Sequence, residues 1–458
     1  MYQIDFNKPE HVHFIGIGGI SMSGLAEILM DEGFTVSGSD AHKSELTEHL
    51  EAKGAKIFYG QKAENIIDGI HVVVYTAAVH PDNPEFAAAV EKGLPILTRA
   101  ELLGQMMKNY QYAVGISGTH GKTTTTSMVT EILLAADADP TISVGGILNS
   151  IGGNIRVGGS ELFVTEACEY TNSFLSFFPN REVILNIEAD HLDFFKDIDD
   201  IRHSFRLFAQ KLPKDGLLVI NSDIDRYEEI VDGLECRIVT CGKRTDSNYR
   251  AEDITYDHFA RAAFRLMIDG QDAGEITLGV PGEHNVYNAL AAVCVAGKLG
   301  LSVDETKRGI ESVKTIGGRS NLIHKGGMTI IDDCYNANPM SMKASLGILK
   351  DAMGRKVAIL GDMGELGENE KELHREVGTF AGNCGIDLLI CVGTLAKEIA
   401  GAAKESSIQA EKQLEAVSFD TLEELLMHLG EQVKQGDTIL VKASHFMNFG
   451  KIVEALQK

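Results

Sequence analysis

The segment from residue 112 to residue 134 contains a short glycine-containing turn between two apolar stretches. It reads YAVGISGTHGKTTTTSMVTEILL, so Lys122 and a run of threonines follow the turn directly. A phosphate site needs inward-pointing backbone N–H groups, a helix amino terminus behind them, a lysine for charge and a hydroxyl for a metal ion. The segment therefore predicts a phosphate-binding loop. Its candidate residues are Gly118, Thr119, His120, Gly121, Lys122, Thr123 and Thr124.

The spacing of this turn departs from the commonest phosphate-loop pattern. In G-x-x-x-x-G-K-[ST] a glycine would stand at position 116, where this chain has Ile116. The alternative interpretation is a glycine-rich turn that caps a helix and carries a lysine by chance. The apolar run before the turn and the helical pattern after it favour the phosphate loop.

Two polar residues follow later apolar runs and add metal chemistry to the loop. Glu166 closes the run Leu162–Thr165, and His191 follows Val183–Leu185 within the sequence NIEADHLD. Magnesium prefers carboxylate oxygens and keeps water and substrate phosphates in its shell. We therefore expect Glu166 to be a magnesium ligand, with Thr123 supplying a hydroxyl. His191 is either a second ligand or a charge near the phosphates.

A second glycine-rich turn lies near the amino terminus. Gly16, Gly18 and Gly19 follow a strand-like run, Ser21 takes the place of the third glycine of a dinucleotide fingerprint, and Asp40 closes the next run. The acid stands where a ribose hydroxyl would be held. Because a glycine-rich turn before a helix receives any diphosphate, this pattern indicates a nucleotide diphosphate rather than NAD. A purely structural turn is the alternative.

These residues must be positioned by a larger α/β framework. Four- and five-residue apolar runs suit strands buried on both faces of a parallel sheet, and helical stretches at 23–32, 122–136 and 287–299 alternate with them. Ligands of such sheets bind beyond the carboxyl ends of the strands. The predicted strands include 13–16, 35–39, 72–76, 114–117, 162–166, 183–186, 217–221, 357–361, 388–393 and 439–442.

Length and composition narrow the class of protein. The 458 residues suggest three domains, which we place at 1–110, 111–317 and 318–458. A net charge of −24 argues against nucleic-acid binding, and no apolar tract is long enough to span a membrane. Seven cysteines without a C-x-x-C pair predict reduced thiols. We therefore expect a cytoplasmic protein that acts on small molecules.

Several motifs, taken in order, resemble the Mur ligases of peptidoglycan precursor synthesis. They cover about the first 320 residues, and together they are highly specific. The motifs are FIGIGGISMSGLAEIL, YTAAVHPDNPE, GISGTHGKTTTTSM, TEACEYTNSFLSFFP, LNIEADHLDFF and PGEHNVYNALAA.

The resemblance implies an α/β chain of three domains: a Rossmann-like amino-terminal domain for the UDP-sugar, a central P-loop ATPase domain and a Rossmann-like carboxy-terminal domain. It places Asn285 and Asn288 near the nucleotide. Many members carry a carbamylated lysine where this chain has Arg206, so we expect none here; the alanine-adding members also lack it. The implied small molecules are ATP, Mg²⁺, UDP-N-acetylmuramate and an amino acid. We expect a monomer or a weak homodimer.

The last third departs from the alanine-adding members. The segments IDDCYNANPMSM, LGDMGELGENEKELH and LVKASHFM resemble the members that add D-alanyl-D-alanine. In this family the last domain presents the amine, so the amino substrate is open between these two types. We expect Arg319 to reach the ATP phosphates and Asp333 to hold the nucleotide. The candidates for amine contact are Asn336, Asn338, Lys442, Ser444 and His445.

The chemistry that unites these residues is ATP-driven amide formation. A carboxylate condenses with an amine once the γ-phosphoryl group of ATP has converted it to an acyl phosphate, and Lys122, Glu166, His191 and Arg319 are the expected catalytic residues. The main hypothesis is the addition of L-alanine to UDP-N-acetylmuramate, with another ligase of the family as the alternative. An NAD-linked oxidoreductase leaves Lys122 without a role, and a non-catalytic ATP-binding protein would not need Glu166 and His191.

Overall fold

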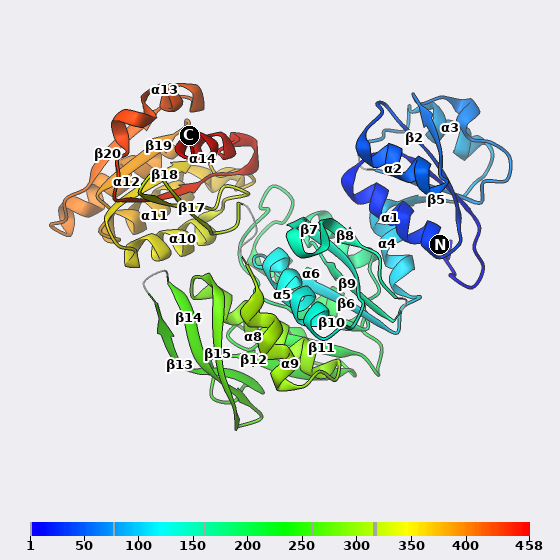
Figure 1. The fold of residues 1–458 in the computed structure, drawn as a ribbon, viewed down its shortest axis with the longest axis horizontal. Helices are drawn as coiled ribbons and strands as arrows, with labels where there is room; N and C mark the ends of the chain where they lie inside the picture. The colour runs from blue at the N-terminus through cyan, green and yellow to red at the C-terminus, as the bar shows by residue number, and fades with distance from the viewer. Residues whose placement is uncertain (1, 77, 160, 258–259, 315–317) are drawn as a thin grey trace.

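The computed structural model describes residues 2–76, 78–159, 161–257, 260–314 and 318–458. Within them the chain forms three sheets of five, ten and six strands, each with its own helices. Figure 1 shows three bodies, with the central one below and the amino-terminal and carboxy-terminal ones above it on opposite sides. The α/β fold and the three-part architecture are thus as the sequence predicts.

The amino-terminal body is a parallel sheet in the order β3-β2-β1-β4-β5. Its central strands are apolar and fully buried; for example, Val72, Val73 and Val74 of β4 are 0% exposed. The elements are β1 (His11–Ile15), α1 (Ile20–Asp31), β2 (Thr35–Asp40), α2 (Glu45–Lys53), β3 (Lys56–Tyr59), η1 (Ala63–Asn65), β4 (Val72–Tyr75), α3 (Pro84–Glu91), β5 (Ile96–Thr98) and α4 (Arg99–Met107). Helix α1 begins three residues before the predicted start, because Gly19 adopts the extended conformation of an N-cap.

The central body is built on the ten-stranded sheet, in the order β15-β14-β13-β12-β11-β10-β6-β9-β7-β8. Strands β6, β7 and β9 to β13 are parallel, the antiparallel pairs β13–β14 and β14–β15 complete one edge, and β8 is antiparallel to β7 at the other. The elements are β6 (Tyr112–Ser117), α5 (Lys122–Ala135), β7 (Thr141–Leu148), η2 (Asn149–Ile151), β8 (Gly153–Arg156), β9 (Leu162–Glu166), η3 (Tyr170–Ser176), β10 (Arg181–Ile184), α6 (Ile198–Ala209), β11 (Leu217–Asn221), α7 (Tyr227–Val231), β12 (Arg237–Gly242), β13 (Tyr249–Tyr256), β14 (Arg261–Ile268), β15 (Gln271–Pro281), α8 (His284–Lys298) and α9 (Val303–Ser312).

The carboxy-terminal body has a six-stranded sheet in the order β16-β17-β21-β18-β19-β20, in which only β16 runs antiparallel to its neighbour. The predicted boundary between 317 and 318 falls at residues 315–317, which lie outside the described residues, so the proposed division stays a prediction. The elements are β16 (Asn321–Lys325), β17 (Met328–Asp332), α10 (Pro339–Asp351), β18 (Arg355–Gly361), η4 (Gly367–Asn369), α11 (Glu370–Asn383), β19 (Leu388–Val392), α12 (Ala396–Gln409), β20 (Glu415–Phe419), α13 (Leu422–Gln432), β21 (Asp437–Lys442), η5 (His445–Met447) and α14 (Gly450–Leu456).

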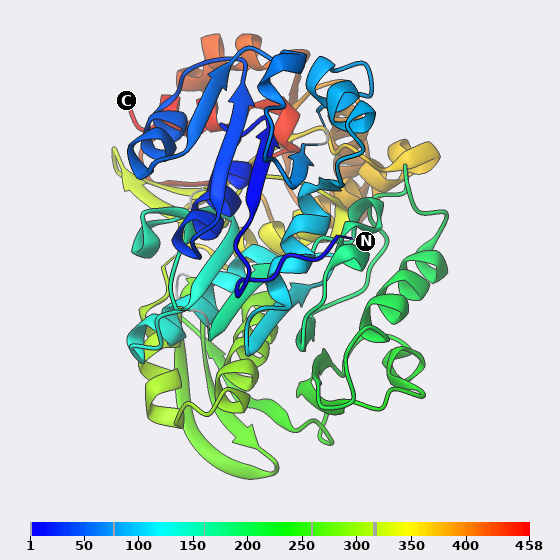
Figure 2. The ribbon, with the colours of Figure 1, turned by 90° about the vertical axis from the view of Figure 1, so that its right-hand side faces the viewer.

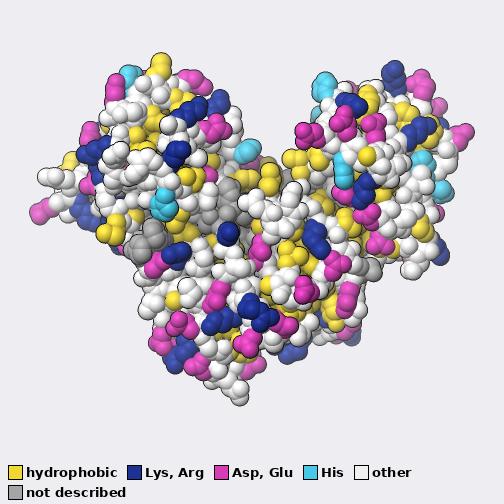
Figure 3. Space-filling view, viewed as in Figure 1, with side chains coloured by type: hydrophobic (Ala, Val, Ile, Leu, Met, Phe, Trp, Pro, Cys, Tyr) yellow, Lys and Arg dark blue, Asp and Glu magenta, His cyan; other side chains and the backbone are white. Residues whose placement is uncertain are grey.

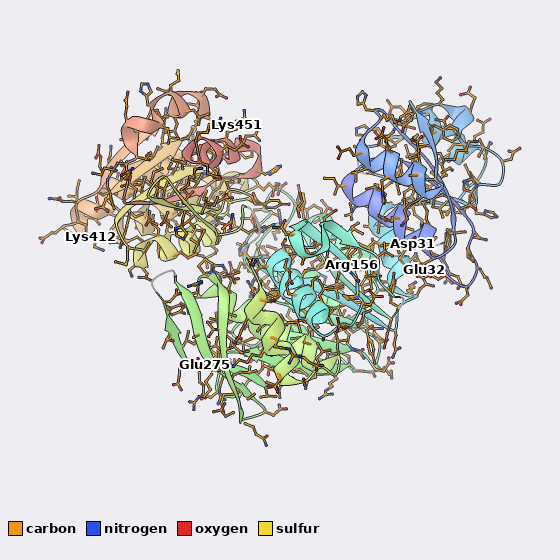
Figure 4. All side chains as sticks on the ribbon, in the orientation of Figure 1. Asp31, Glu32, Arg156, Glu275, Lys412 and Lys451 are labelled. Atoms are coloured by element: carbon orange, nitrogen blue, oxygen red, sulfur yellow. The ribbon has the colours of Figure 1, made fainter. Side chains whose placement is uncertain are left out.

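The amino-terminal body packs closely on the central one through α1. A Cβ atom at Gly24 would come within 1.8 Å of Ile155 Cδ1 on β8, so only glycine fits this contact without a shift. Figure 4 labels Asp31 at the end of α1 and Arg156 on β8, on either side of this junction. The space-filling view shows a wide notch between the two upper bodies (Figure 3), and the view turned by 90° places them one in front of the other (Figure 2).

Every cysteine is a free thiol, as the sequence predicts. Among the described residues, no helix is both long and apolar enough to cross a lipid bilayer.

Candidate functional site

The turn between β6 and α5 forms a cradle at the carboxyl end of the central sheet. Gly118 and Gly121 have φ values of +142° and +82°, which favour glycine. A Cβ atom at Gly121 would lie 2.4 Å from Asn288 Oδ1, and one at Gly118 would lie 2.9 Å from Leu185 Cβ. The backbone N–H of His120 donates to Asn186 Oδ1 at 2.7 Å. Close packing from two directions therefore fixes the shape of the turn.

The ammonium group of Lys122 has three oxygen partners in the cradle. Its Nζ donates to Gly118 O at 2.6 Å, to Thr119 O at 3.2 Å and to Glu169 Oε2 at 2.8 Å. Burial lowers the pKa of Lys122, but the charge and hydrogen bond of Glu169, together with the charges of Cys168 and Glu166, outweigh this effect and the pKa is raised. The lysine is therefore a charged group held at the turn, and binding an anion there requires it to release one of these partners.

Glu166 and Thr123 meet beside the lysine. Thr123 Oγ1 donates to Glu166 Oε2 at 3.1 Å, and Glu166 Oε1 accepts from the backbone N–H of Gly145 at 2.5 Å. Helix α5 and strand β9 supply the two side chains, because β6 and β9 are parallel neighbours that end at the same edge. The predicted hydroxyl and carboxylate ligands thus lie within hydrogen-bond distance of each other.

His191, the third predicted metal ligand, lies in the loop after β10 beside Glu169 rather than in direct contact with Glu166 or Thr123. It is 13% exposed, its ring stacks on Tyr170 with centroids 4.5 Å apart, and its Nε2 lies 3.9 Å from Glu169 Oε1. That Glu169 oxygen is buried and accepts no hydrogen bond. A threonine hydroxyl, a carboxylate, an imidazole and a bare buried oxygen fit a hard divalent cation such as magnesium.

Protein ligands alone do not enclose a metal at this place. Within the described parts of the chain, no group of three or more His, Cys, Asp or Glu side chains is arranged to hold a metal ion. Magnesium dehydrates reluctantly and usually takes one or two carboxylates together with water and phosphates. A sparse set of protein donors beside a phosphate cradle is compatible with this ion.

Residues of the carboxy-terminal body reach the cradle. Arg319 Nη2 donates to Thr123 Oγ1 at 3.1 Å, and its guanidinium lies 4.0 Å from the centroid of the Tyr335 ring. Asn338 Nδ2 donates to Asp190 Oδ2 at 2.6 Å and lies 3.2 Å from His120 Nδ1. The cradle is thus shared between two bodies of the molecule.

A cavity of about 1020 Å³ opens over the cradle between these two bodies. Asn285 and Asn288 line it from α8; both are 3% exposed, and Asn288 Nδ2 donates to Asn285 Oδ1 at 2.9 Å. Thr124 and Asn336 also line it. The volume lies at the upper end of the range for small-molecule pockets.

Several predicted residues of the carboxy-terminal body bond to one another. Lys442 Nζ donates to Asp333 Oδ2 at 2.6 Å and to Asn336 O at 3.0 Å, while Ser444 Oγ donates to Ala337 O at 3.2 Å. Asp333 also accepts from the backbone N–H of Ser320. These contacts shape the loop after β17, whereas His445 is exposed. Their predicted roles toward the nucleotide and the amine stay predictions.

The amino-terminal glycine turn has a different environment. Gly16 has a φ of +86°, and the backbone N–H of Gly18 donates to Asp40 Oδ2 at 2.8 Å. Gly19 is the N-cap of α1, and Ser21 Oγ accepts from Arg99 Nη1 at 3.2 Å. Asp40 therefore holds the turn itself in this structure.

Three residues at these sites were not predicted. Glu169 lies three positions after Glu166, Asp190 directly precedes His191, and Arg99 contacts the first turn. Burial lowers the pKa of Arg99, which is the expected effect on a cation with little access to water. The strand-end rule could have drawn attention to Asp190, but nothing in the sequence pairs Glu169 with Lys122. Arg206, which the sequence predicts to stand in place of a modified lysine, donates to the backbone oxygen of Asp232.

Comparison with protein families matches each body separately. Residues 11–111 match the Mur ligase family catalytic domain, residues 116–296 the Mur ligase middle domain, and residues 318–445 the Mur ligase glutamate ligase domain. The chain is 59% identical over 350 residues to the UDP-N-acetylmuramate–L-alanine ligase of Lachnospira eligens, covering 76% of both chains. It is 52% identical over 359 residues to that of Lachnoclostridium phytofermentans, again covering 76% of both.

Solved structures agree with this assignment. UDP-N-acetylmuramate-alanine ligase MurC from Thermotoga maritima superposes with a TM-score of 0.70 at 25% identity, covering 97% of this chain and 98% of its own. MurF from Acinetobacter baumannii superposes with a TM-score of 0.69 at 25% identity, covering 92% and 91%. The chain belongs to the Mur ligase family.

Proposed function

We propose that this protein is an ATP-dependent ligase that joins L-alanine to the carboxylate of UDP-N-acetylmuramate, with release of ADP and phosphate. The observation that carries the proposal is the cradle at Lys122, with Glu166, His191 and Arg319 around it, in a chain 59% identical to ligases of this name. UDP-N-acetylmuramate supplies the carboxylate and accepts the amine, and L-alanine donates the amine.

The need for ATP follows from the chemistry of the acid. An ionised carboxylate has a poor leaving oxygen, so an amine does not displace it at neutral pH. Transfer of the γ-phosphoryl group to the carboxylate gives an acyl phosphate, and the amine then attacks the carbonyl carbon and expels phosphate. The protein contributes positioning and stabilisation of charge on the transferred group.

The proposed roles follow from the arrangement of the cradle. Lys122 and the backbone N–H groups of 118–124 bind the phosphates, and Arg319 adds positive charge from the opposite body. Thr123, Glu166 and His191 would hold Mg²⁺, which neutralises phosphate charge when bound. Asn285, Asn288 and Asp333 face the nucleotide. Closure of the cavity between the two bodies would keep water from the acyl phosphate, which would otherwise hydrolyse.

The first turn is the proposed site of the UDP diphosphate. Gly16, Gly18, Gly19 and Ser21 supply the turn, Asp40 orients it, and Arg99 supplies a cation beside Ser21. Amine contact is proposed for Asn336, Asn338, Lys442, Ser444 and His445. A cytoplasmic location and a monomeric or weakly dimeric state also remain proposals.

A second candidate is the addition of D-alanyl-D-alanine to a peptide-bearing acceptor. The similarity to MurF over 92% of this chain, together with the MurF-like segments at 331–342 and 360–374, favours it. The amino-terminal body instead carries the motifs of the alanine-adding type, so L-alanine is the first proposal.

The test is a panel of substrates. Phosphate release is measured with UDP-N-acetylmuramate plus L-alanine, glycine, L-serine or D-alanyl-D-alanine, and with a peptide-bearing acceptor plus the dipeptide. We expect turnover with L-alanine and the unmodified acceptor. Turnover only with the dipeptide and the peptide-bearing acceptor would replace the first proposal by the second.

A further inference from the structure

His191 is contacted by a carboxylate from the other side of the cavity. Glu365 Oε2, in the loop after β18 of the carboxy-terminal body, lies 2.9 Å from His191 Nδ1, an ion-pair contact whose geometry is not that of a hydrogen bond. The opposite ring nitrogen, Nε2, faces Glu169 and the proposed metal site. The histidine thus lies between a carboxylate of one body and the cradle of the other.

Two hydrogen bonds hold the loop that carries Glu365. The backbone N–H of Gly364 donates to Ser444 Oγ at 2.9 Å, and that of Met363 donates to His374 Nε2 at 2.9 Å. His374 is fully buried, and its Nδ1 donates to the backbone oxygen of Glu370 at 2.6 Å. Burial lowers the pKa of His374, which keeps it neutral and able to accept from Met363. The LGDMGELGENEKELH segment therefore builds a fixed platform.

This platform is docked on the histidine loop at more than one point. A Cβ atom at Gly367 would lie 3.1 Å from the backbone oxygen of Leu192, so the two loops are in close contact. On the other side of His191, Asp190 accepts from the backbone N–H of His191 at 2.9 Å and from Asn338 Nδ2 at 2.6 Å. Residues of the carboxy-terminal body thus hold both neighbours of His191.

Backbone conformation supports a functional reason for these contacts. His191 and Glu365 both have positive φ values, +52° and +62°, which cost free energy for residues other than glycine. An ordinary surface ion pair contributes little and needs no strained backbone. Here the imidazole is only 13% exposed. The Glu365 side chain is 46% exposed, so the buried ring and the strained backbone, rather than a buried carboxylate, are what favour a role in ring orientation.

We propose that Glu365 is a positioning residue that fixes the His191 ring from the carboxy-terminal body, so that Nε2 is free to bind a divalent cation only while the two bodies are docked. Histidines that bind metals commonly give their other ring N–H to a carboxylate, which sets the tautomer and the ring orientation. The inference rests on the proposed function for the presence of the metal and nucleotide. Under this proposal, the carboxy-terminal body, which would also present the amine, helps to build the phosphate site.

The test uses Mn²⁺ as the probe and the full chain with a non-hydrolysable ATP analogue. Glu365→Ala and Glu365→Gln are compared with Glu372→Ala, which removes an exposed glutamate from the first turn of α11. Loss of an outer-shell partner weakens metal binding by about 10- to 100-fold. We expect that loss for Glu365→Ala, a smaller one for Glu365→Gln because its amide keeps the size of the carboxylate beside the ring, and none for Glu372→Ala.

Two readouts separate positioning from other effects. Electron spin-echo measurement of bound Mn²⁺ should show a ¹⁴N coupling from an imidazole in the unmodified protein, which weakens or disappears in Glu365→Ala. Weaker Mn²⁺ binding with an unchanged ¹⁴N coupling would mean a simple charge effect and would overturn the proposal, as would unchanged affinity. Because the measurement needs no amino substrate, its result can still be interpreted if the substrate panel fails.

Discussion

The two glycine-rich turns of this molecule follow the same local plan but differ in what completes them. Each lies between a buried parallel strand and a helix, and each places a glycine in the left-handed region. The first is completed within its own body, where Asp40 accepts from Gly18 N–H. The second is completed by two bodies, because Arg319 contacts Thr123 from the carboxy-terminal side.

This difference indicates that the two turns can bind their ligands under different conditions. A turn completed locally is ready to bind whenever its domain is folded, which suits a substrate held throughout the reaction. A turn completed across an interface depends on domain docking, which suits a step that must not occur in open water. The same local motif can thus form a site that is always ready to bind or a site that depends on domain docking, according to its surroundings.

The largest expected effect comes from breaking the second turn. Lys122→Ala removes the charge at the phosphates, and we expect kcat for phosphate release to fall by about 10³-fold or more, since removing a single donor to developing charge already costs 10²–10³. Continuous phosphate detection with saturating ATP and both substrates measures it.

The matched control for this change is Lys214→Ala, which removes an exposed cation of the same body. Its turnover should equal that of the unmodified protein. Suppose that Lys122→Ala retains turnover and that its unfolding curve coincides with that of the unmodified protein. The cradle would then take no part in phosphate release, and the expected difference between the two turns would be lost.

A smaller effect is expected from the first turn. Asp40→Ala deletes a charge-assisted hydrogen bond to Gly18, worth about 1.5–3 kcal/mol, so KM for the UDP-sugar should rise by at least tenfold. The KM for ATP should not change, because the two turns lie in separate bodies. Initial-rate kinetics with each substrate varied in turn measures both constants.

Asp68→Ala serves as the comparison here, since Asp68 is an exposed acid of the same body. A parallel rise in both KM values for Asp40→Ala would contradict the separation of the two turns.

The smallest effect tests the sheet beneath the second turn rather than the turn itself. Glu182 on β10 is fully buried, both of its carboxylate oxygens are without hydrogen-bond partners, and it pairs with Gly115 and Leu218. Burial raises the pKa of Glu182 well above 4.5, so the folded protein retains a proton that the unfolded chain loses. Its contribution to stability is therefore fully present below about pH 4.5 and is lost as the pH rises.

Glu182→Met should raise the thermal midpoint by a few degrees at pH 8, corresponding to about 1–2 kcal/mol, and by less near pH 5. Glu275→Met, an exposed change on β15 labelled in Figure 4, should leave the midpoint unchanged. A gain at pH 5 that equals the gain at pH 8 would mean that Glu182 carries no proton in the folded state. Neither variant should alter turnover.

The strands and the cradle could be predicted from local sequence because their signals are local. Runs such as Val72–Val74 are buried on both faces, and GTHGKTTTT lies in the expected strand–turn–helix context. The sequence predicts the starts of α1 and α8 three residues late, because Gly19 and Glu283 begin helices without a strong capping signal.

Contacts across the chain could not be predicted in this way. Glu169 meets Lys122 because β9 lies beside β6, and its segment has no helical or strand period of its own. Glu365 meets His191 only because two bodies dock, and a single sequence contains no information on that placement. Lys442 was proposed as an amine contact, yet its bond to Asp333 depends on the pairing of β17 with β21.

The close contact between Gly24 and Ile155 fixes how the amino-terminal body sits on the central body. Helix α1 begins immediately after the first turn and reaches the central body within one turn of its start. Even one added methyl group at position 24 would push the two bodies apart. It would lie 2.9 Å from Ile155 Cβ and would also meet the flexible end of that side chain. The tilt needed to relieve it would move the first turn relative to the cradle, so the absence of a side chain at position 24 helps to set how the two turns are placed.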